Sequence, residues 1–387
     1  MTTSEYFVSD EIESAETLPA AAFTDAGYLE RELATLFRRT WLCLPERQSS
    51  ELRDDSRSLA EMVSARGSRV PFSLLDRPFF LQRGWKDKKL RLFPNVCTHA
   101  WYPLVLGAGR SAQLTCAQHG RQFDCAGKFL SQPGFKECRN FPRKEDHLPE
   151  LPVEAWGPLH FACLDKPAAA FGSVTKELEA STAKMPLDKL ERRPVAGEVR
   201  ELAGNWKQHS WNYMDKFHIT FIHRAPGGLA DAIDVNSYKT ELYPYSSLQW
   251  VYAKNPAAGF DPAWLPKRFQ DPADPSRRVL ALWWFIFPNL TLNFYPWGLS
   301  VNVYMPVPGQ PERTLFQWYM YSWDDAKFAR REELWLSDQV DREDVDAMAQ
   351  ARRGARSGFA PRGRFSPTEE RGPHWFHQLA YRLALPG

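Results

Sequence analysis

The chain has 387 residues, more than one ordinary hydrophobic core, so two domains are expected. Its formal net charge of +2 gives no general attraction to nucleic acid or to a membrane surface. The apolar run at residues 281–287 is too short to span a bilayer, and residues 1–14 lack the basic and apolar regions of a signal peptide. We therefore expect a cytoplasmic protein with no membrane or nucleic-acid partner.

The first part of the chain combines a helix with many short strands. Residues 23–41 are predicted to form a helix, because Thr24 or Asp25 can cap its start and apolar residues follow at roughly helical spacing. Residues 45 to about 165 are strand-rich, since short apolar segments are broken by Pro, Gly and charged residues. Small residues at 168–171 then indicate a link to a second domain.

The second part has a different pattern. A helix is predicted near residues 203–221, and a long charged helix from an Asp324 cap to about Arg353. Between them, apolar and polar side chains alternate over residues 290–295, as in a half-buried antiparallel strand. The strands predicted here are residues 282–287, 290–294, 299–305 and 314–321.

Two short motifs in the strand-rich part each pair one Cys with one His. Cys97 and His99 read C-x-H, and after sixteen residues Cys116 and His119 read C-x-x-H. Two thiolates and two imidazoles in this order are the ligand set of a Rieske [2Fe–2S] cluster, in which two His replace two Cys on one iron. A structural zinc site is the alternative, but zinc sites more often pair like ligands, as in C-x-x-C. The pattern favours two facing loops that ligate two different irons.

A second group of polar residues lies in 212–223 and contains D-x-x-H-x4-H. Asp215 and His218 are three residues apart and would share a helix face. The helix must bend or end before His223, and residues 224–228 supply the stop. Two His and one carboxylate form the facial triad of non-haem Fe(II) oxygenases, so this spacing beside a Rieske motif indicates an iron site. The alternative is that these His are ordinary hydrogen-bonded structural groups.

The carboxylate of this triad has more than one candidate. Asp215 is the first. In the long charged helix, Asp344 lies four residues from an apolar side chain in each direction, which places a carboxylate where it is costly unless it is paired or bound to metal. Asp341 is the runner-up on that helix, whereas Glu343 and Asp346 are expected to be solvated.

These motifs resemble the catalytic α subunit of Rieske non-haem iron oxygenases, also called aromatic-ring-hydroxylating oxygenases. The resemblance covers nearly the whole chain and is nearest to the α-only, choline-monooxygenase-like group. It also rests on Gly204-Asn205-Trp206-Lys207 and on Glu343-Asp344 followed by R-G-x-R-S at 353–357. It implies an α+β protein with a β-rich Rieske domain and a catalytic helix-grip domain, an antiparallel sheet covered by helices. The implied parts are residues 1–44, a helical segment packing on the catalytic domain, the Rieske domain at 45–167, and the catalytic domain at 168–387.

The resemblance implies two cofactors, one Rieske [2Fe–2S] cluster and one mononuclear non-haem Fe(II). Asp215 would then carry electrons and protons from a cluster His to an iron ligand. The implied ligands are Cys97 and Cys116 on one cluster iron, His99 and His119 on the other, and His218, His223 and Asp344 on the Fe(II).

The implied reaction is reductive O2 activation, with electrons from a ferredoxin or an NAD(P)H-dependent reductase and oxygen inserted into a small organic substrate. The working centres of this family meet across a subunit interface, which implies a head-to-tail homotrimer. Aromatic residues in 283–297 are candidates for an apolar or cation-binding pocket, although most are expected to belong to the core of the sheet. Ring hydroxylation, oxidation of a quaternary-ammonium compound and demethylation all remain open. A Rieske electron carrier without oxygenase iron and a zinc-stabilised binding protein are the rival functions.

Three departures from the family pattern surround the ligands. Ala100-Trp101 stand where the family usually has R-G, Arg121 stands where it often has Trp, and Trp211 replaces the usual Glu. Such changes affect the surroundings that tune a metal centre. An arginine cluster is expected to be solvated surface with structural pairing, with docking of an acidic ferredoxin as the alternative. Its members are Arg352, Arg353, Arg356, Arg362 and Arg364.

Overall fold

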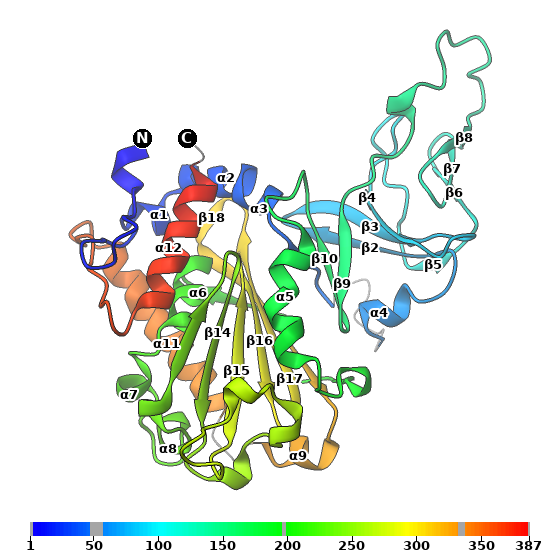
Figure 1. Cartoon of the computed structure of the whole chain (residues 1–387). Coiled ribbons are helices and arrows are strands. Elements are labelled where there is room, and N and C mark those ends of the chain that lie inside the picture. The colour runs from blue at the N-terminus through cyan, green and yellow to red at the C-terminus, as the bar shows by residue number, and fades with distance from the viewer. Residues whose placement is uncertain (1–2, 47–56, 196–198, 332–336, 386–387) are drawn as a thin grey trace. The chain divides into compact units, whose positions relative to one another are not determined.

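The structure is a computed structural model in which two compact units are described separately (Figure 1). The discontinuous unit comprises Met1–Thr40 and Ala169–Gly387, and the inserted unit comprises Trp41–Ala168. No helix in the described part of the chain is long and apolar enough to cross a membrane. The residues that the structure describes are 3–46, 57–195, 199–331 and 337–385.

The described residues of the inserted unit form three small antiparallel sheets. Its strands, sheet by sheet, are β1 (Leu42–Cys43), β10 (Leu159–Ala162) and β9 (Val153–Trp156); β4 (Leu90–Pro94), β3 (Arg77–Arg83), β2 (Ser68–Leu74) and β5 (Gly109–Arg110); and β6 (Gln113–Thr115), β7 (Gln122–Asp124) and β8 (Phe129–Ser131). Its short helices are α4 (Leu59–Met62) and η3 (Lys144–Asp146). The first Cys/His motif follows β4, and the second connects β6 to β7, so both lie in loops supported by strands.

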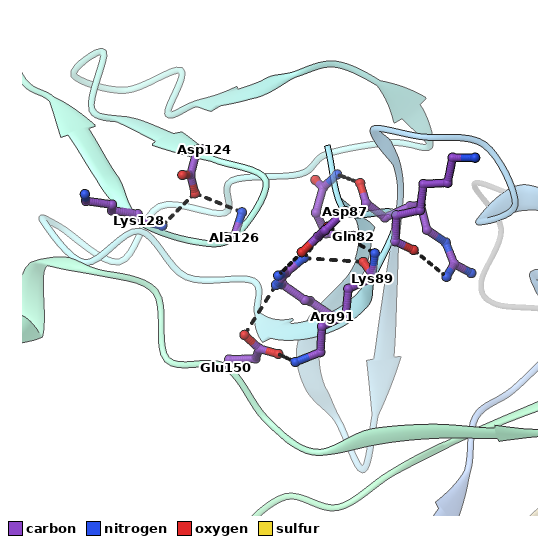
Figure 2. Close-up of polar contacts among 10 residues, drawn as sticks. Gln82, Asp87, Lys89, Arg91, Asp124, Ala126, Lys128 and Glu150 are labelled. Carbon is purple, nitrogen blue, oxygen red and sulfur yellow. Dashed lines mark hydrogen bonds and ion pairs between the residues drawn. The ribbon is translucent and has the colours of Figure 1, made fainter. Parts of the chain in front are cut away.

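Polar contacts fix the strands that lead to these loops. On β4, the Arg91 side chain lies between two carboxylates. Its Nη2 is 2.5 Å from Asp87 Oδ2, and its Nε is 3.4 Å from Glu150 Oε2 (Figure 2). The bond to Arg91 holds the pKa of Asp87 at about 2, well below its usual range. After β7, Asp124 Oδ1 accepts the backbone N–H groups of Ala126 and Lys128 and so closes the turn into β8 (Figure 2). These contacts therefore hold the strand before the first Cys/His loop and the turn after the strand that follows the second loop.

The discontinuous unit is built on one antiparallel sheet of eight strands. Seven strands lie in the order β11-β18-β17-β16-β15-β14-β13, and β12 also pairs with β18. The strands are β11 (Glu191–Arg193), β12 (Val199–Ala203), β13 (Lys239–Leu242), β14 (Ser246–Tyr252), β15 (Val279–Ile286), β16 (Leu290–Tyr295), β17 (Gly298–Val307) and β18 (Gln310–Ser322). The α-helices are α1 (Ala21–Thr24), α2 (Ala26–Ala34), α3 (Leu36–Arg39), α5 (Phe171–Thr182), α6 (Trp206–Met214), α7 (Ile219–Ile222), α8 (Leu229–Ala232), α9 (Asp325–Ala329), α11 (Ser337–Ala355) and α12 (Arg371–Ala384). Short 3-10 helices are η1 (Thr3–Tyr6), η4 (Leu187–Lys189), η5 (Val235–Ser237), η6 (Pro256–Ala258), η7 (Pro262–Trp264) and η8 (Lys267–Phe269).

The strand register places polar side chains on one face of this sheet. Trp283 pairs with Asn293, Asn293 with Ser300, and Ser300 with Met320, so these side chains share a face. The predicted alternation on β16 is present, but the expectation of a half-buried strand is wrong because Asn293 and its polar neighbours are also buried. The face that a half-buried strand would expose to solvent is here covered by helices and lines a cavity.

Helix α6 is fixed to the N-terminal helices by a fully buried ion pair. Lys207 Nζ lies 2.9 Å from Glu32 Oε2 on α2, and both side chains have no exposed surface. Trp206 Nε1 donates to the same Glu32 oxygen at 3.1 Å. The ammonium also lies 5.3 Å and 5.4 Å from the ring centroids of Phe23 and Tyr28. These contacts set the position of α6 within the discontinuous unit.

Three predicted helices differ in their bounds. The helix expected over 23–41 is divided into α1, α2 and α3; Asp25 caps α2 by accepting the Tyr28 N–H at 2.7 Å, which ends α1. The helix expected over 203–221 ends at Met214, so Asp215 and His218 do not share a helix face. The helix expected from Asp324 is present as α9 and α11, and residues 332–336 lie outside the described residues.

Candidate metal centres

The two Cys/His loops of the inserted unit have the same backbone hydrogen bonds. Cys97 N–H donates to the carbonyl five residues later, on Tyr102, and Trp101 N–H donates back to Cys97 O. In the second loop Cys116 donates to Arg121 O, and Gly120 N–H donates back to Cys116 O. The fourth residue after each Cys has a positive φ, +61° at Trp101 and +69° at Gly120. Each loop is therefore one tight turn that brings its His beside its Cys.

The side chains of these loops suit an iron–sulfur cluster. Cys97 and Cys116 are buried, whereas His99 is half-buried and His119 exposed, and the two imidazole centroids are 4.8 Å apart. Burial raises the pKa of Cys97, and the neighbouring Cys116 thiol raises it further, so a cation is needed to hold Cys97 as a thiolate. Burial and the nearby charges of His119 and Arg121 lower the pKa of His99, which favours a neutral imidazole ligand. The donor set fits two thiolates and two imidazoles on one cluster.

The second candidate centre lies in the discontinuous unit, where α7 meets α11. His218 directly precedes α7 and His223 directly follows it, so one helical turn separates the two rings. Asp344 lies on α11, which contacts both α6 and α7. Among the described residues, these three side chains form a group that could hold one metal ion. The chain thus brings together two His from one short segment and a carboxylate from a distant helix.

Three ligand atoms of this group converge on one point. His218 Nε2 and His223 Nε2 are 3.1 Å apart, and Asp344 Oδ1 lies 3.4 Å and 3.1 Å from them. Burial lowers the pKa of His218, but hydrogen bonds with Asp215 and Asp344 outweigh it and raise that pKa to about 9. Burial also raises the pKa of Asp344, but its bonds to the two imidazoles outweigh this and hold it well below its usual range. The site thus favours positive charge, and the arrangement fits a 2-His-1-carboxylate iron site.

Further polar side chains orient these three ligands. Asp215 Oδ2 lies 3.3 Å from His218 Nδ1, and Glu343 Oε2 lies 2.8 Å from His223 Nδ1. A carboxylate on Nδ1 fixes the imidazole with Nε2 pointing at the metal. Asn212 Nδ2 donates to Asp344 Oδ1 at 2.7 Å. The expectation that Glu343 is solvated is wrong, because α11 turns its side chain toward His223.

The other two carboxylate candidates have different partners, and Asp215 contacts the far nitrogen of His218. Asp341 forms an ion pair with Arg200, although it also lines the cavity described below. Most of the arginine cluster is bound within the discontinuous unit: Arg362 and Arg364 donate to backbone carbonyls of the N-terminal segment, and Arg352 and Arg356 pair with one glutamate. This supports the interpretation of that cluster as structural pairing.

A cavity of about 160 Å³ adjoins the triad in the discontinuous unit. One wall is aromatic: Trp283 Nε1 donates to Tyr295 OH at 3.0 Å, and Tyr295 stacks on Trp297 with ring centroids 5.2 Å apart. Of the aromatic residues considered as pocket candidates, these three line the cavity, whereas the others pack elsewhere in the sheet. Polar lining comes from Asn293, Ser300, Asn302, Asp341 and Arg331.

The sequence matches two protein families, in the order in which the sites occur. Residues 58–142 match the Rieske [2Fe-2S] domain, and residues 187–384 match the catalytic domain of the ring hydroxylating alpha subunit. The chain belongs to this family. It is therefore a Rieske non-haem iron oxygenase, with a Rieske cluster and a mononuclear iron as cofactors, and it needs O2 and an electron donor. This decides against a bare electron carrier and a zinc-stabilised binding protein.

Relatives of known activity cover almost the whole chain. Choline monooxygenase of Arabidopsis thaliana is 26% identical over 97% of this chain and 84% of its own length. The carnitine monooxygenase oxygenase subunit of Escherichia coli K12 is 26% identical over 95% of this chain and 93% of its own. A quaternary ammonium Rieske monooxygenase has the same fold, with a TM-score of 0.73 and 19% identity over 99% of this chain and 98% of its own. Naphthalene 1,2-dioxygenase follows with a TM-score of 0.69 and 18% identity over 97% and 93%. The predicted α+β fold, Rieske domain plus catalytic domain, is confirmed.

Proposed function

We propose that this α subunit oxidises a small quaternary-ammonium compound at an iron held by His218, His223 and Asp344. The observation that carries the proposal is the aromatic wall of Trp283, Tyr295 and Trp297 beside that triad. Aromatic faces attract a methylated ammonium group through its positive charge, and this attraction strengthens where water is excluded. The names of the choline and carnitine relatives agree with this substrate class.

The polar lining of the cavity argues against a hydrocarbon substrate. Asn293 and Asn302 lie on the same sheet face as the aromatic wall, and Asp341 faces the cavity from α11. Asn293 is already bonded to Tyr213 and to the Ser300 carbonyl. An aromatic hydrocarbon offers Asn302 and Asp341 no hydrogen bond, so binding it would bury them without a new partner. Ring hydroxylation remains the competing activity, and the fold shared with naphthalene 1,2-dioxygenase makes it the right comparison in an assay.

The residues of the site have separable tasks in this proposal. When bound, the cluster and the iron supply electron transfer and O2 activation. Asp215 and Glu343 hold the Nδ1 protons of the two His, Asn212 holds the carboxylate of Asp344, and the aromatic wall orients the methyl groups. The Asp215 side chain is 17% exposed and contacts the ligand His218. We propose that it bridges to a cluster His, His99 or His119, of a neighbouring copy.

This bridge requires an assembly and a donor. A head-to-tail homotrimer places the inserted unit of one copy against the discontinuous unit of the next, and such rings use heterologous interfaces. We propose a ferredoxin or an NAD(P)H-dependent reductase as the electron source. Light scattering of the purified protein tests the trimer, and reduction of the cluster by candidate donors tests the partner.

The first experiment is iron and acid-labile sulfide analysis of anaerobically purified protein, with EPR after dithionite reduction. About three irons and two sulfides per chain, with a Rieske signal, are expected from the two proposed ligand sets. Turnover is then measured with choline, carnitine and glycine betaine, and with naphthalene as the competing class. A ring-hydroxylated product without any oxidised ammonium product would overturn the proposed substrate class.

An uncharged isostere tests the aromatic wall directly. 3,3-Dimethylbutan-1-ol has the shape of choline without its charge, so it should bind much more weakly than choline to the wild-type protein. Trp283→Leu should weaken choline binding and leave binding of the neutral isostere nearly unchanged, because it removes the ring face that attracts the cation. Equal affinity for both compounds would show that the wall does not recognise charge.

A further inference from the structure

Arg121 is a buried charge that the proposed reaction does not use. It directly follows the second Cys/His loop, and its side chain is only 2% exposed. Its Nη1 donates to Asp146 Oδ1 at 3.2 Å and to Thr98 Oγ1 at 2.8 Å, and its Nε donates to Gln132 Oε1. Phenylalanine rings enclose the guanidinium, with centroids 5.3 Å, 5.7 Å and 5.4 Å from Cζ for Phe129, Phe135 and Phe141. Water is excluded, so little screens this charge.

The contacts of Arg121 reach both ligand loops. Thr98 stands between Cys97 and His99 in the first loop. Gln132 Nε2 lies 3.1 Å from His99 Nδ1. The backbone carbonyl of Arg121 itself accepts the Cys116 N–H at 2.8 Å in the second loop. One residue therefore contacts both loops, the first through its side chain and the second through its backbone carbonyl.

Asp146 is the opposing charge at this position. Its side chain is 11% exposed, and its second oxygen accepts the Arg143 backbone N–H at 2.9 Å. Its backbone carbonyl accepts the Thr98 hydroxyl at 2.9 Å, so it also borders the first loop. The pair has no net charge. Each partner borders the cluster loops, however, so each charge exerts its own electrostatic effect on the cluster.

We propose that Arg121 and Asp146 set the reduction potential of the Rieske cluster in opposite directions, with Arg121 raising it and Asp146 lowering it. One-electron reduction adds one negative charge to the cluster. A nearby buried positive charge stabilises the reduced form, and a negative charge destabilises it, because charge and hydrogen bonding around the cluster set its potential. The proposal rests on the cluster alone and does not depend on which substrate the enzyme oxidises.

The test compares two near-isosteric charge removals in the full-length holoenzyme. Arg121→Gln removes the positive charge and keeps a donor for Thr98, so the midpoint potential should become more negative. Asp146→Asn removes the negative charge, so the potential should become more positive. Arg143→Gln is the matched control, because the Arg143 side chain is 72% exposed and water screens its charge. Potentials are measured by EPR-monitored redox titration, with iron and sulfide content confirming an intact cluster.

Opposite shifts, both larger than that of Arg143→Gln, would support the proposal. A purely structural role would loosen the loops in both variants and move both potentials in the same direction, which would overturn it. Shifts no larger than the control would overturn it as well. If Arg121→Gln does not assemble a cluster, Arg121→Lys and Asp146→Asn carry the test. A near-native potential for the lysine variant with a positive shift for Asp146→Asn supports the proposal, and any other combination rejects it.

Discussion

The two proposed metal centres are positioned by different means, although both proposed ligand sets include two imidazoles. In the inserted unit, the backbone hydrogen bonds of two equivalent turns place Cys97, His99, Cys116 and His119. In the discontinuous unit, side-chain carboxylates and an amide orient the triad, and Asp344 comes from a helix far along the chain. The cluster site is thus a property of short local loops, whereas the iron site depends on how helices pack.

The largest expected effect is the loss of one centre while the other remains intact. His223→Ala should abolish turnover and lower the iron content while the Rieske EPR signal remains, because it removes one of three ligands of the triad. Cys116→Ser should instead abolish the Rieske signal. Iron and sulfide analysis, EPR and product assays measure both. Turnover retained by the alanine variant would remove His223 from the iron site.

Lys207→Met tests the buried ion pair that anchors α6, the helix that precedes His218 of the proposed iron site. Lys207→Met leaves Glu32 buried and uncompensated, which should cost about 3–5 kcal/mol of unfolding free energy. The double variant Lys207→Met/Glu32→Leu should recover most of this loss, because it removes both charges. Urea unfolding measures the effect. A single-variant loss below about 1 kcal/mol would show that the pair does not anchor α6.

Asp215→Asn tests the contact between the proposed bridge and the iron ligand. Loss of a carboxylate that orients a metal-binding imidazole typically costs about 10–100-fold, so we expect a loss of that size in turnover with the cluster signal unchanged. Asp346→Asn is the control, since Asp346 is an exposed carboxylate on α11. Turnover per reduced cluster is the measurement. Equal rates for the two variants would contradict a bridging role.

Buried histidines predict an acid-sensitive discontinuous unit. Burial lowers the pKa of His377 to about 3, and its Nδ1 accepts the Leu18 N–H at 3.0 Å. The unfolded chain binds a proton near pH 6.5 and the folded chain does not, so each pH unit below that lowers the unfolding free energy by about 1.4 kcal/mol. His377→Gln should flatten this dependence between about pH 6.5 and pH 3. The unfolding free energy is measured at several pH values for both proteins. The same pH dependence in the wild type and in His377→Gln would contradict the prediction.

The smallest effect expected decides between two neighbouring aspartates. Asp341→Asn should leave the iron content unchanged. It should lower the unfolding free energy by no more than about 1 kcal/mol, because Asp341 forms a partly exposed ion pair with Arg200. Asp344→Asn should lower the iron content strongly, because its carboxylate lies against both imidazoles. Iron analysis of the two purified variants is sufficient. Loss of iron in the Asp341 variant would reverse the assignment.

The comparison of the two centres also explains what could be predicted from the sequence. The α+β fold with a Rieske and a catalytic domain, which the family resemblance implied, is confirmed. The motifs that carry the resemblance are short and local, so they can be read from the sequence. The role of Glu343 could not be predicted, because helix periodicity gives its angular position on α11 but not the position of α11 beside His223. The end of α6 before Asp215 could not be predicted, because apolar residues continue at helical spacing beyond that position. The burial of Arg121 depends on rings and acids contributed by later strands and loops.

The insertion of one unit within the other has a consequence for biosynthesis. Residues 41–168 are contiguous, so all their partners within the unit have left the ribosome when residue 168 emerges. The ion pair of Glu32 can form only after Lys207 has been synthesised. The triad can form only after Asp344 has been synthesised, near the end of translation. Because domains generally fold as units during synthesis, the inserted unit can fold and receive its cluster first. The nascent N-terminal helices meanwhile lack the α6 residues that bury Glu32 in the folded unit.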